Sequence, residues 1–291
     1  MNILTFDIEE WYLEQQRLGR VDKYAEYNVY LEQILDKLDE RQLKATFFCV
    51  GEMTKSFPQI IKKIQERGHE IGCHSNIHTW LNKMSMAECR EDTHAAVDAL
   101  EQCMGKKVLS YRAPAFSIGE SNKWAFEILA ENGITRDASV FPAKRDFGGF
   151  PNFGQQKPTM ISYSGIVIKE FPVPMINILG RDIAYSGGGY FRFFPLNFIK
   201  KEMNKSEYVM CYFHIDDLVQ EMQGVMSREA YESYFKEPGT LKNRCMRYFK
   251  SNFGKKRSMS KLQRLILSED FMNIEQADAS IDWTFTQQVT F

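Results

Sequence analysis

Residues 2–10 read NILTFDIEE, an apolar run that closes on acidic residues. Short apolar runs of this kind are typical of buried strands. The next periodic segment carries Leu31, Ile34, Leu35 and Leu38 at the spacing of one helix face. This part of the chain is therefore predicted as a strand followed by a helix, with carboxylates at the end of the strand.

The same strand-and-helix unit recurs along the chain. Further predicted strands are the short apolar runs at 45–50 (ATFFCV), 70–73 (EIGC), 107–111, 134–137 and 208–213 (YVMCYF). Segments with apolar residues at helical spacing lie between several of these strands. Ser85 and Glu88 form a capping box at the start of one such predicted helix. Repeated units imply a parallel sheet, and five or more within about 215 residues predict a barrel or a doubly wound sheet.

Two regions depart from this alternation. Residues 142–192 are rich in Gly, Pro and aromatic residues, contain a predicted hairpin around Gly165, and lead into SGGGYFRFFP at 186–195. We interpret them as an elaborated loop region. From about residue 216 onward the pattern is helical and polar, and residues 269–291 carry mixed signals.

The composition is that of a soluble globular protein. The 291 residues include 37 Lys plus Arg against 38 Asp plus Glu, and 44% are hydrophobic, which excludes a disordered, collagenous or coiled-coil chain. A net charge of −1 also argues against a protein that coats nucleic acid. Six cysteines without a C-x-x-C pair favour reduced thiols. No secretory signal or membrane-spanning run is evident, so we expect a cytoplasmic protein.

Polar residues cluster just after the predicted strands. The residues concerned are Asp7, Glu9 and Glu10 after the first strand, His74 and His78 after the third, Arg112 after the fourth, Asp137 after the fifth, and His214 after the last. Three of the five histidines therefore stand at strand ends. Because ligand sites in both architectures lie at the carboxyl ends of the strands, these residues are the candidates for chemistry.

His74 and His78 have the spacing of a metal site. They are four residues apart, so one helical turn would place both imidazoles on one face. A carboxylate from another strand would complete a site of two histidines and one acid, with an open position for water. The alternative is a pair of surface or capping histidines, and we assign His69 and His94, which lack this context, to that class.

The other strand-end residues suggest acid–base chemistry. Asp7 and Glu9 lie two apart on an extended strand end and share a face, so one could bind an ion while the other takes a proton. Arg112 would keep that base ionised, or would form an ordinary salt bridge. His214 has the intrinsic pKa needed to protonate a leaving amine, or is a buried, hydrogen-bonded core histidine.

Four motifs resemble those of a known family. FDIEEW at 6–11, HSNIH at 74–78, YRAPAF at 111–116 and YFHID at 212–216 are similar, in order and spacing, to motifs of the polysaccharide deacetylases with a NodB homology domain, or carbohydrate esterase family 4. In the last motif Tyr212 replaces the usual Leu. The separated acids of the first motif, the run SGGGYFRFFP and the basic C-terminal stretch further resemble a bacterial subgroup associated with exopolysaccharide assembly.

The resemblance implies a fold and a set of roles. It implies a distorted (β/α)7 TIM-like barrel of the NodB type over residues 1–215 and a divalent metal, usually Zn²⁺. From the residue pattern we expect residues 216–291 to form a helical, basic C-terminal extension packed on this barrel. The implied roles are Asp7 as general base, His214 as general acid, Arg112 as the group that tunes Asp7, Glu9 (or Glu10), His74 and His78 as metal ligands, the backbone N–H of Ala115 as oxyanion donor, and Asp137 as a supporting acid.

The implied reaction is metal-assisted hydrolysis of an N-acetyl, or less often O-acetyl, group on an amino sugar, releasing acetate. The substrate would be an acetylated amino-sugar glycan or a carrier-linked oligosaccharide. Trp11, Trp80 and Tyr190 could stack on sugar rings, or could pack in the core. Two other readings remain: a related amidohydrolase acting on a small non-sugar amide or ureide, and a catalytically silent glycan-binding homologue.

A basic segment contradicts the neutral average. Between Pro238 and Ser268 there are nine Lys or Arg and no Asp or Glu. Residues 242–264 could therefore contact an anionic glycan, a carrier or a membrane surface. We favour the alternative of a solvated helix face, whose other side, with Leu262, Leu265 and Ile266, packs on the barrel.

Overall fold

A computed structural model describes residues 1–8, 22–145, 148–220, 222, 224–235 and 237–291. The strands are β1 (Asn2–Ile8), β2 (Thr46–Cys49), β3 (Glu70–Cys73), β4 (Ser110–Tyr111), β5 (Arg136–Asp137), β6 (Thr159–Tyr163), β7 (Ile166–Glu170), β8 (Met175–Ile178), β9 (Arg181–Ala184), β10 (Val209–His214) and β11 (Gln287–Thr290). The α-helices are α2 (Asp22–Glu40), α3 (Met53–Ser56), α4 (Pro58–Glu66), α5 (Met86–Met104), α6 (Ala125–Glu131), α7 (Gly188–Phe193), α8 (Leu196–Lys205), α9 (Ile215–Leu218), α10 (Arg228–Phe235), α11 (Leu241–Asn252), α12 (Lys255–Ser268) and α13 (Ile274–Ser280). Short 3₁₀ turns are η1 (Leu81–Lys83), η2 (Pro114–Phe116) and η3 (Trp283–Phe285).

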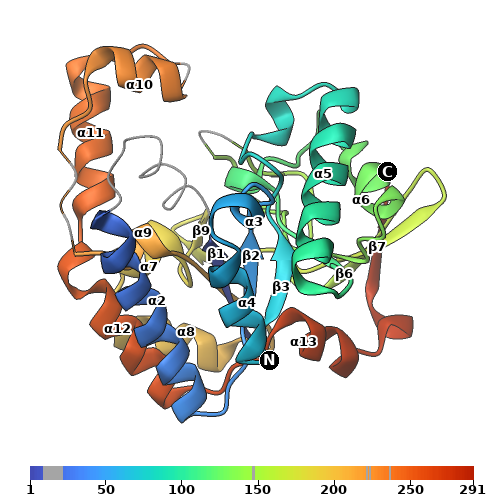
Figure 1. The fold of residues 1–291 in the computed structure, drawn as a ribbon, viewed down its shortest axis with the longest axis horizontal. Helices are drawn as coiled ribbons and strands as arrows, with labels where there is room; N and C mark the ends of the chain where they lie inside the picture. The colour runs from blue at the N-terminus through green and yellow to red at the C-terminus, as the bar shows by residue number, and fades with distance from the viewer. Residues whose placement is uncertain (9–21, 146–147, 221, 223, 236) are drawn as a thin grey trace.

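The main sheet contains the parallel strands that the sequence predicts. Its order is β10-β1-β2-β3-β4-β5-β7-β6-β11, and every neighbouring pair from β10 to β7 is parallel. These seven strands, with helices packed outside them (Figure 1), form the distorted (β/α)7 barrel that was expected. Strand β6 runs antiparallel to β7, and β8 pairs with β9 in a separate hairpin.

Strand β7 corrects the expectation for residues 142–192. The predicted hairpin around Gly165 forms, with β6 and β7 as its arms, but β7 also pairs with β5 and so belongs to the barrel. Ile168 and Glu170 of β7 are fully buried. A local pattern of Gly, Pro and aromatic residues does not show this pairing, because the partner strand lies about 30 residues earlier in the chain.

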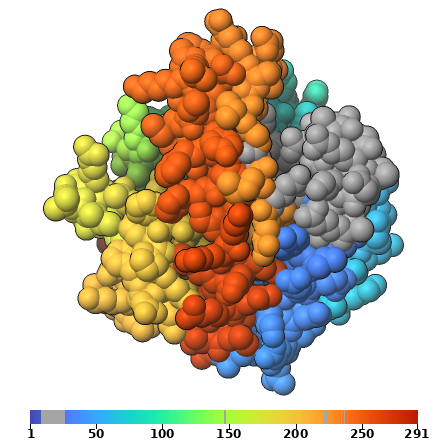
Figure 2. Space-filling view, turned by 90° about the vertical axis from the view of Figure 1, so that its left-hand side faces the viewer, coloured from blue at the N-terminus to red at the C-terminus, as the bar shows by residue number. Residues whose placement is uncertain are grey.

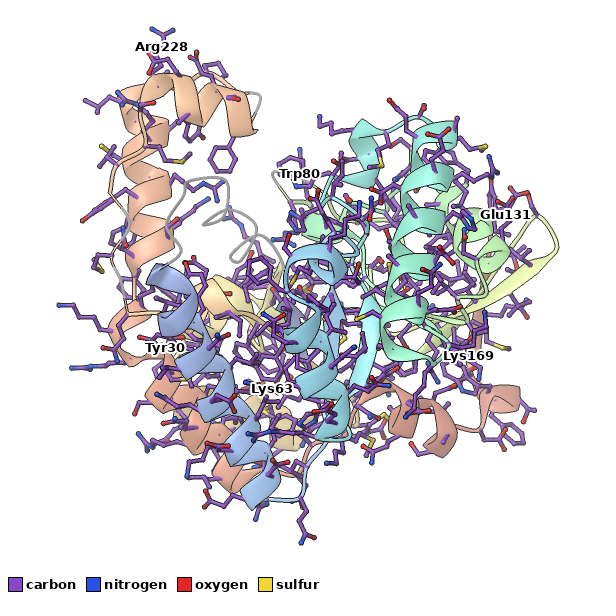
Figure 3. All side chains as sticks on the ribbon, viewed as in Figure 1. Tyr30, Lys63, Trp80, Glu131, Lys169 and Arg228 are labelled. Carbon is purple, nitrogen blue, oxygen red and sulfur yellow. The ribbon has the colours of Figure 1, made fainter. Side chains whose placement is uncertain are left out.

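The core lies on both sides of β1. Phe6 stacks on Phe47 of β2 with ring centroids 5.0 Å apart and contacts Phe213 of β10 at 5.9 Å. On the outer face, α2 and α4 lie side by side (Figure 3), and Arg67 joins them through Glu32 at 2.7 Å. The capping box predicted at Ser85 and Glu88 forms at the start of α5.

Glycine at 187 has a packing role. A Cβ at this position would lie 2.4 Å from both the backbone carbonyl oxygen and a ring carbon of Tyr212. The run SGGGYFRFFP therefore lets the start of α7 approach β10 closely. Because β10 carries His214 at its end, this approach helps to fix the wall of the barrel beside that histidine.

The C-terminal region packs on the barrel in several places. Leu262, Leu265 and Ile266 of α12 are fully buried, as expected for the apolar side of the basic segment. Met272 accepts a hydrogen bond from the N–H of Leu4 at 3.1 Å, and β11 adds a strand beside β6, so the region after residue 215 is not wholly helical. The boundary near residue 215 stays a prediction. Figure 2 shows α11 and α12 running along one face of the molecule.

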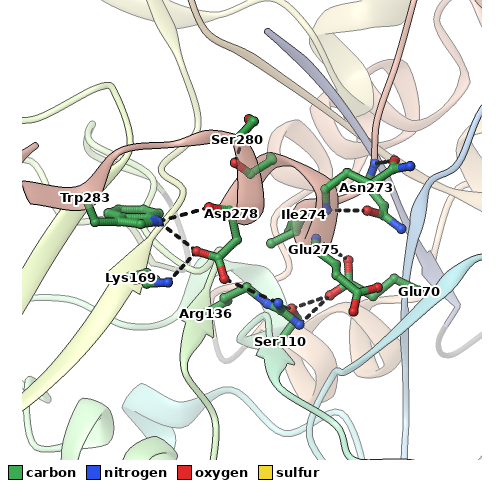
Figure 4. Close-up of polar contacts among 12 residues, drawn as sticks. Glu70, Ser110, Arg136, Lys169, Asn273, Ile274, Glu275, Asp278, Ser280 and Trp283 are labelled. Carbon is green, nitrogen blue, oxygen red and sulfur yellow. Dashed lines mark hydrogen bonds and ion pairs between the residues drawn. The ribbon is translucent and has the colours of Figure 1, made fainter.

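A polar layer ties the C-terminal region to the amino ends of the strands (Figure 4). Glu70 accepts hydrogen bonds from Ser110 at 2.6 Å and from Arg136 at 3.2 Å. Asp278 of α13 accepts from Lys169 at 2.6 Å and from the Trp283 indole at 2.7 Å. This end of a barrel serves stability, which leaves the carboxyl ends of the strands for chemistry.

Among the helices that the structure describes, none is long and apolar enough to cross a membrane.

Candidate active site

The strand order brings the predicted residues to one edge of the sheet. Asp7 lies opposite His214 in the register of β1 and β10, and opposite Phe48 in that of β1 and β2. His74 directly follows β3, and Arg112 follows β4. Because these strands are parallel neighbours, their carboxyl ends meet, and the four polar side chains lie at the same end of the barrel.

Asp7 and Arg112 form a buried ion pair. Arg112 Nη1 donates to Asp7 Oδ1 at 2.7 Å, and both side chains are at most 2% exposed. The same nitrogen donates to Thr5 Oγ1 at 2.8 Å, and the guanidinium lies 4.3 Å from the centre of the Phe48 ring. A carboxylate removed from water keeps its charge only beside such a cation. The salt bridge considered from the sequence thus forms at the sheet end, and it is buried.

His214 lies between two carboxylates. Its Nε2 is 3.6 Å from Asp7 Oδ2, and its Nδ1 is 2.9 Å from Asp217 Oδ2. The side chain is one-third exposed, so the ring is not a buried core histidine. An Nδ1–H donated to Asp217 fixes the ring orientation and directs Nε2 toward Asp7.

Asp217 is a site residue that the sequence analysis did not single out. Burial would raise the pKa of Asp217, but the hydrogen bond with His214 and the charge of Arg192 outweigh burial and lower this pKa to about 2. Arg192 Nη1 contacts Asp217 Oδ1 at 2.6 Å. The available signal was local: an acid three residues after a histidine at a strand-to-helix junction, which is the spacing of a capping box.

Replacing Asp217 with asparagine is expected to lower the free energy of unfolding at pH 7 by about 2 kcal/mol. The folded-state pKa of about 2 lies below the ordinary value of 3.8 for an aspartate, so the carboxylate stabilises the fold above pH 4, and this stabilisation is lost as the pH falls from about 4 to 2. Urea unfolding of both proteins from neutral to acidic pH measures the difference. A deficit that stays constant through this acidic range would contradict the assignment.

His74 and His78 lie close together, but not on a helix. Their ring centroids are 5.1 Å apart. The predicted helical turn is wrong: the segment is a loop in which Ser75 and His78 adopt positive φ angles of 62° and 61°. Ser75 Oγ accepts the backbone N–H of His78 at 2.9 Å, so a side chain replaces the helical hydrogen-bond pattern.

The hydrogen bond made by the ring of His74 is one that metal-binding histidines commonly make. Its Nδ1 lies 2.7 Å from the backbone oxygen of Arg112. Because a carbonyl oxygen only accepts, Nδ1 carries the hydrogen, and the lone pair stays on Nε2. In metal-binding histidines, the ring nitrogen that does not bind the metal usually donates a hydrogen bond to an oxygen in this way.

The predicted third ligand cannot be placed. Glu9, its alternative Glu10, and Trp11 lie outside the described residues. Within the described part of the chain, no group of three or more His, Cys, Asp or Glu residues is arranged to hold a metal ion. His74 and His78 thus supply two nitrogen donors, and a first-strand carboxylate as third ligand stays a prediction.

Asp137 supports the Arg112 segment through Ser139. Ser139 Oγ donates to Asp137 Oδ1 at 2.5 Å and accepts the backbone N–H of Ala113 at 2.8 Å. Glu170, which the sequence analysis also did not single out, accepts the N–H of Val140 at 3.0 Å. Burial and the neighbouring Asp137 carboxylate raise the pKa of Glu170, so we assign the proton of this pair to Glu170.

The loop after β4 is tightly folded at Ala115. Ala115 and Phe116 both have positive φ, 54° and 53°. A Cβ at Gly148 would lie 2.5 Å from the carbonyl oxygen of Phe116 and 2.8 Å from that of Ala115, so only glycine permits this approach. The loop is therefore held in one conformation next to Arg112.

The two described aromatic candidates differ in position. Trp80, at the upper edge of the main body in Figure 3, lines a cavity of about 420 Å³. The cavity is also lined by Asn82, Ser117, Asn122, Arg145 and Phe235, among others. Phe235 comes from α10, so the wall is shared between the barrel and the C-terminal region. Tyr190 lies on α7, is partly exposed, and is not among the residues lining this cavity.

Two family models divide the chain between them. One, described as polysaccharide deacetylase, matches residues 3–136. The other, described as a domain of unknown function (DUF3473), matches residues 138–279. The first match ends at β5, so it includes Asp7, His74, His78 and Arg112 but not His214.

Curated relatives match over short alignments. An uncharacterised Bacillus subtilis protein, YlxY, is 36% identical over 104 residues, which are 36% of this chain and 32% of that protein. A peptidoglycan-N-acetylglucosamine deacetylase of Bacillus cereus is 37% identical over 99 residues, which are 34% of this chain and 36% of the relative. The matched part thus spans about a third of the length of these relatives.

A solved structure matches the whole chain. A Mycobacterium smegmatis protein assigned as a polysaccharide deacetylase aligns with a TM-score of 0.65 at 18% identity, covering 100% of this chain and 92% of that one. At this identity the likeness is one of fold. This similarity of fold agrees with the barrel formed by the seven parallel strands.

Proposed function

We propose, from the match of residues 3–136 to the polysaccharide deacetylase family model, that this chain is a metal-dependent hydrolase that removes N-acetyl groups from the amino sugars of a glycan. The observation that carries the proposal is the position of Asp7. Its carboxylate lies 2.7 Å from Arg112 and 3.6 Å from His214, at the end of the barrel where such folds hold their catalytic groups. A charged base and a histidine therefore face each other.

Asp7 is the general base in this proposal. The contact with Arg112 compensates the carboxylate charge in a buried position, and in this proposal the carboxylate takes a proton from the attacking water. Its second oxygen, Oδ2, faces His214 rather than Arg112. In this proposal Oδ1 pairs with Arg112, and Oδ2 takes part in proton transfer.

His74 and His78 would hold the cation, with Glu9 as the third ligand. A divalent ion with two histidines and one carboxylate, Zn²⁺ above all, lowers the pKa of water and polarises a carbonyl oxygen. The fixed tautomer of His74, whose Nδ1 hydrogen bonds to the Arg112 carbonyl, leaves Nε2 free of a proton for this task.

His214 is the general acid. The Asp217 carboxylate, itself paired with Arg192, orients the imidazole and stabilises its protonated form. After water has added to the acetyl carbon, His214 gives a proton to the departing amine, and the products are acetate and a free amino sugar. The backbone N–H of Ala115 is our candidate donor to the oxyanion.

The cavity next to Trp80 favours a glycan over a small ureide. Its volume of about 420 Å³ falls within the range of ligand pockets, and the aromatic residues Trp80 and Phe235 are among those that line it. The charged residues Glu120 and Arg145 are also among the lining residues. Apolar faces beside polar groups match a pyranose ring, which has C–H groups on its faces and hydroxyls at its rim.

Metal content and acetate release test the proposal together. We expect the purified protein to contain about one divalent ion per chain and to release acetate from acetylated amino-sugar oligomers, and we expect His74→Ala to lose both. His94→Ala is the matched control, because His94 lies on α5, where its Nδ1 is 3.2 Å from Oδ1 of Asn132. Retention of metal and activity by His74→Ala would sink the proposed site.

The substrate panel separates the alternatives. Turnover of a ureide without acetate release from any sugar would favour the small-amide reading. Metal binding with no turnover of any substrate would favour a silent glycan-binding protein. Comparing N-acetylated with O-acetylated oligomers decides which linkage is cleaved.

A further inference from the structure

One face of α11 carries aromatic and basic side chains toward solvent. Lys242, Met246, Phe249 and Lys250 recur at three- and four-residue intervals, and Phe253 continues the same row just after the helix. Phe249 is 58% exposed, Met246 51% and Phe253 41%. We call these five residues the α11 stripe. Exposed phenylalanine is unfavourable in water, so a contiguous row calls for a partner.

The α11 stripe continues onto α7. Phe193 is 62% exposed, and its ring centroid lies 5.6 Å from that of Phe253, which in turn lies 5.4 Å from that of Phe249. Lys261 of α12 donates to the backbone oxygens of Phe191 and Phe194, which holds the end of α7 in place. The three rings thus form one apolar patch on a fixed support.

The charged residues of α11 and α12 have one sign. Exposed cations nearby in sequence are Lys242, Lys250, Lys256, Arg257 and Arg264, with no acid between Pro238 and Ser268. By contrast, Lys255 is buried and contacts Asp216 at 2.9 Å, so that member of the basic segment has a structural role.

Helix stability does not account for the remaining cations. Lys255, Lys256 and Arg257 occupy the first turn of α12. The helix dipole places partial positive charge at that end, where cations are unfavourable. Lys256 and Arg257 are exposed on this turn, so their placement is better explained by an anionic partner than by folding.

We propose that the α11 stripe and Phe193 dock this protein on an anionic lipid bilayer surface. Phenylalanine and methionine side chains enter the boundary between headgroups and acyl chains, and the surrounding lysines and arginines bind anionic headgroups. A glycan polyanion would be recognised by polar and hydrogen-bonding groups, which the patch of Phe193, Phe249 and Phe253 lacks. The positive charge fits any anionic partner, and the exposed phenylalanine rings select the bilayer among them, because its acyl-chain boundary accepts apolar side chains.

The docking surface is linked to the proposed active site by Arg192. This residue precedes Phe193, contacts Asp217 at 2.6 Å and donates to the backbone oxygen of Lys250 at 2.9 Å. Asp217 is the partner of His214. Docking through the patch would therefore hold this side of the barrel near the membrane surface, independently of whether the proposed reaction is correct.

Vesicle co-sedimentation tests the proposal. We expect the protein to bind mixed phosphatidylcholine and phosphatidylglycerol vesicles, to bind phosphatidylcholine vesicles at least tenfold more weakly, and to lose binding as salt is raised. The double variant Phe249→Glu/Phe253→Glu and the triple variant Lys242→Glu/Lys250→Glu/Lys256→Glu should each weaken binding about tenfold or more.

The matched control is Phe285→Glu. Phe285 is 87% exposed and lies on η3, in the C-terminal part of the chain away from α11 (Figure 1). It should bind vesicles as the wild type does, and thermal melts should show all variants folded. Equal binding by folded stripe variants and wild type would overturn the proposal. So would a dimer of the wild type, seen by sedimentation without lipid, that the stripe variants lose, because a second copy would then cover this face.

Discussion

Replacing Asp7 with asparagine is expected to lower kcat for acetate release from an acetylated amino-sugar oligomer by about 10²–10⁴-fold. Asparagine keeps the shape of the side chain and its oxygen toward Arg112 but cannot accept a proton from water. The buried position of Asp7, at 2% exposed, leaves little access for a substitute base from bulk solvent. We expect KM to change much less than kcat, since the carboxylate acts on the reacting water.

Two measurements distinguish a lost base from a damaged site. Metal content of Asp7→Asn should stay close to that of the wild type, because His74 and His78 hold the ion in our proposal, whereas His74→Ala should lose it. A thermal melt shows that assays are made on folded protein. Normal kcat in folded Asp7→Asn would exclude Asp7 as the base and would direct attention to the carboxylates at residues 9 and 10.

Strand ends could be predicted from the sequence, and their partners could not. A run such as NILTFD signals a buried strand by its own composition, and the rule that parallel strands share a ligand edge then groups Asp7, His74, Arg112 and His214. The spacing of Asp217 to His214 was a local signal that the sequence analysis did not use, whereas its contact with Arg192, 25 residues away in the chain, could not be predicted. Contacts of that range leave no periodic signal.

The conformation of short segments was the second feature that the sequence did not predict. The spacing of His74 and His78 correctly indicated neighbouring rings, but the turn between them depends on Ser75, whose side chain accepts the N–H of His78. A polar side chain that accepts a backbone N–H in this way competes with the helical hydrogen bond, so the segment forms a loop instead of a helical turn. Likewise, β11 pairs with β6 across more than 120 residues, so strand propensity alone could not place it in the sheet.

Replacing Arg112 with methionine is expected to lower the free energy of unfolding by about 3–5 kcal/mol, the usual effect of removing one partner of a buried ion pair. Asp7 would remain buried without its cation, and Thr5 Oγ1 and the backbone oxygen of Ala138 would each lose a hydrogen-bond donor. Methionine keeps an unbranched chain between the rings of Phe48 and Phe116, so most of the loss reflects charge rather than volume.

The double variant Asp7→Asn/Arg112→Met tests this explanation. If the uncompensated carboxylate causes most of the loss, removing that charge as well should make the double variant more stable than the sum of the single effects predicts, by about 1–3 kcal/mol. Urea unfolding of the four proteins gives this coupling energy, and strict additivity would show that the pair does not act as a unit. Acetate release should stay low in the double variant even where stability recovers, because the base is absent. Recovery of stability without recovery of turnover separates the two roles of the pair: Arg112 compensates a buried charge, and Asp7 uses that charge in the reaction.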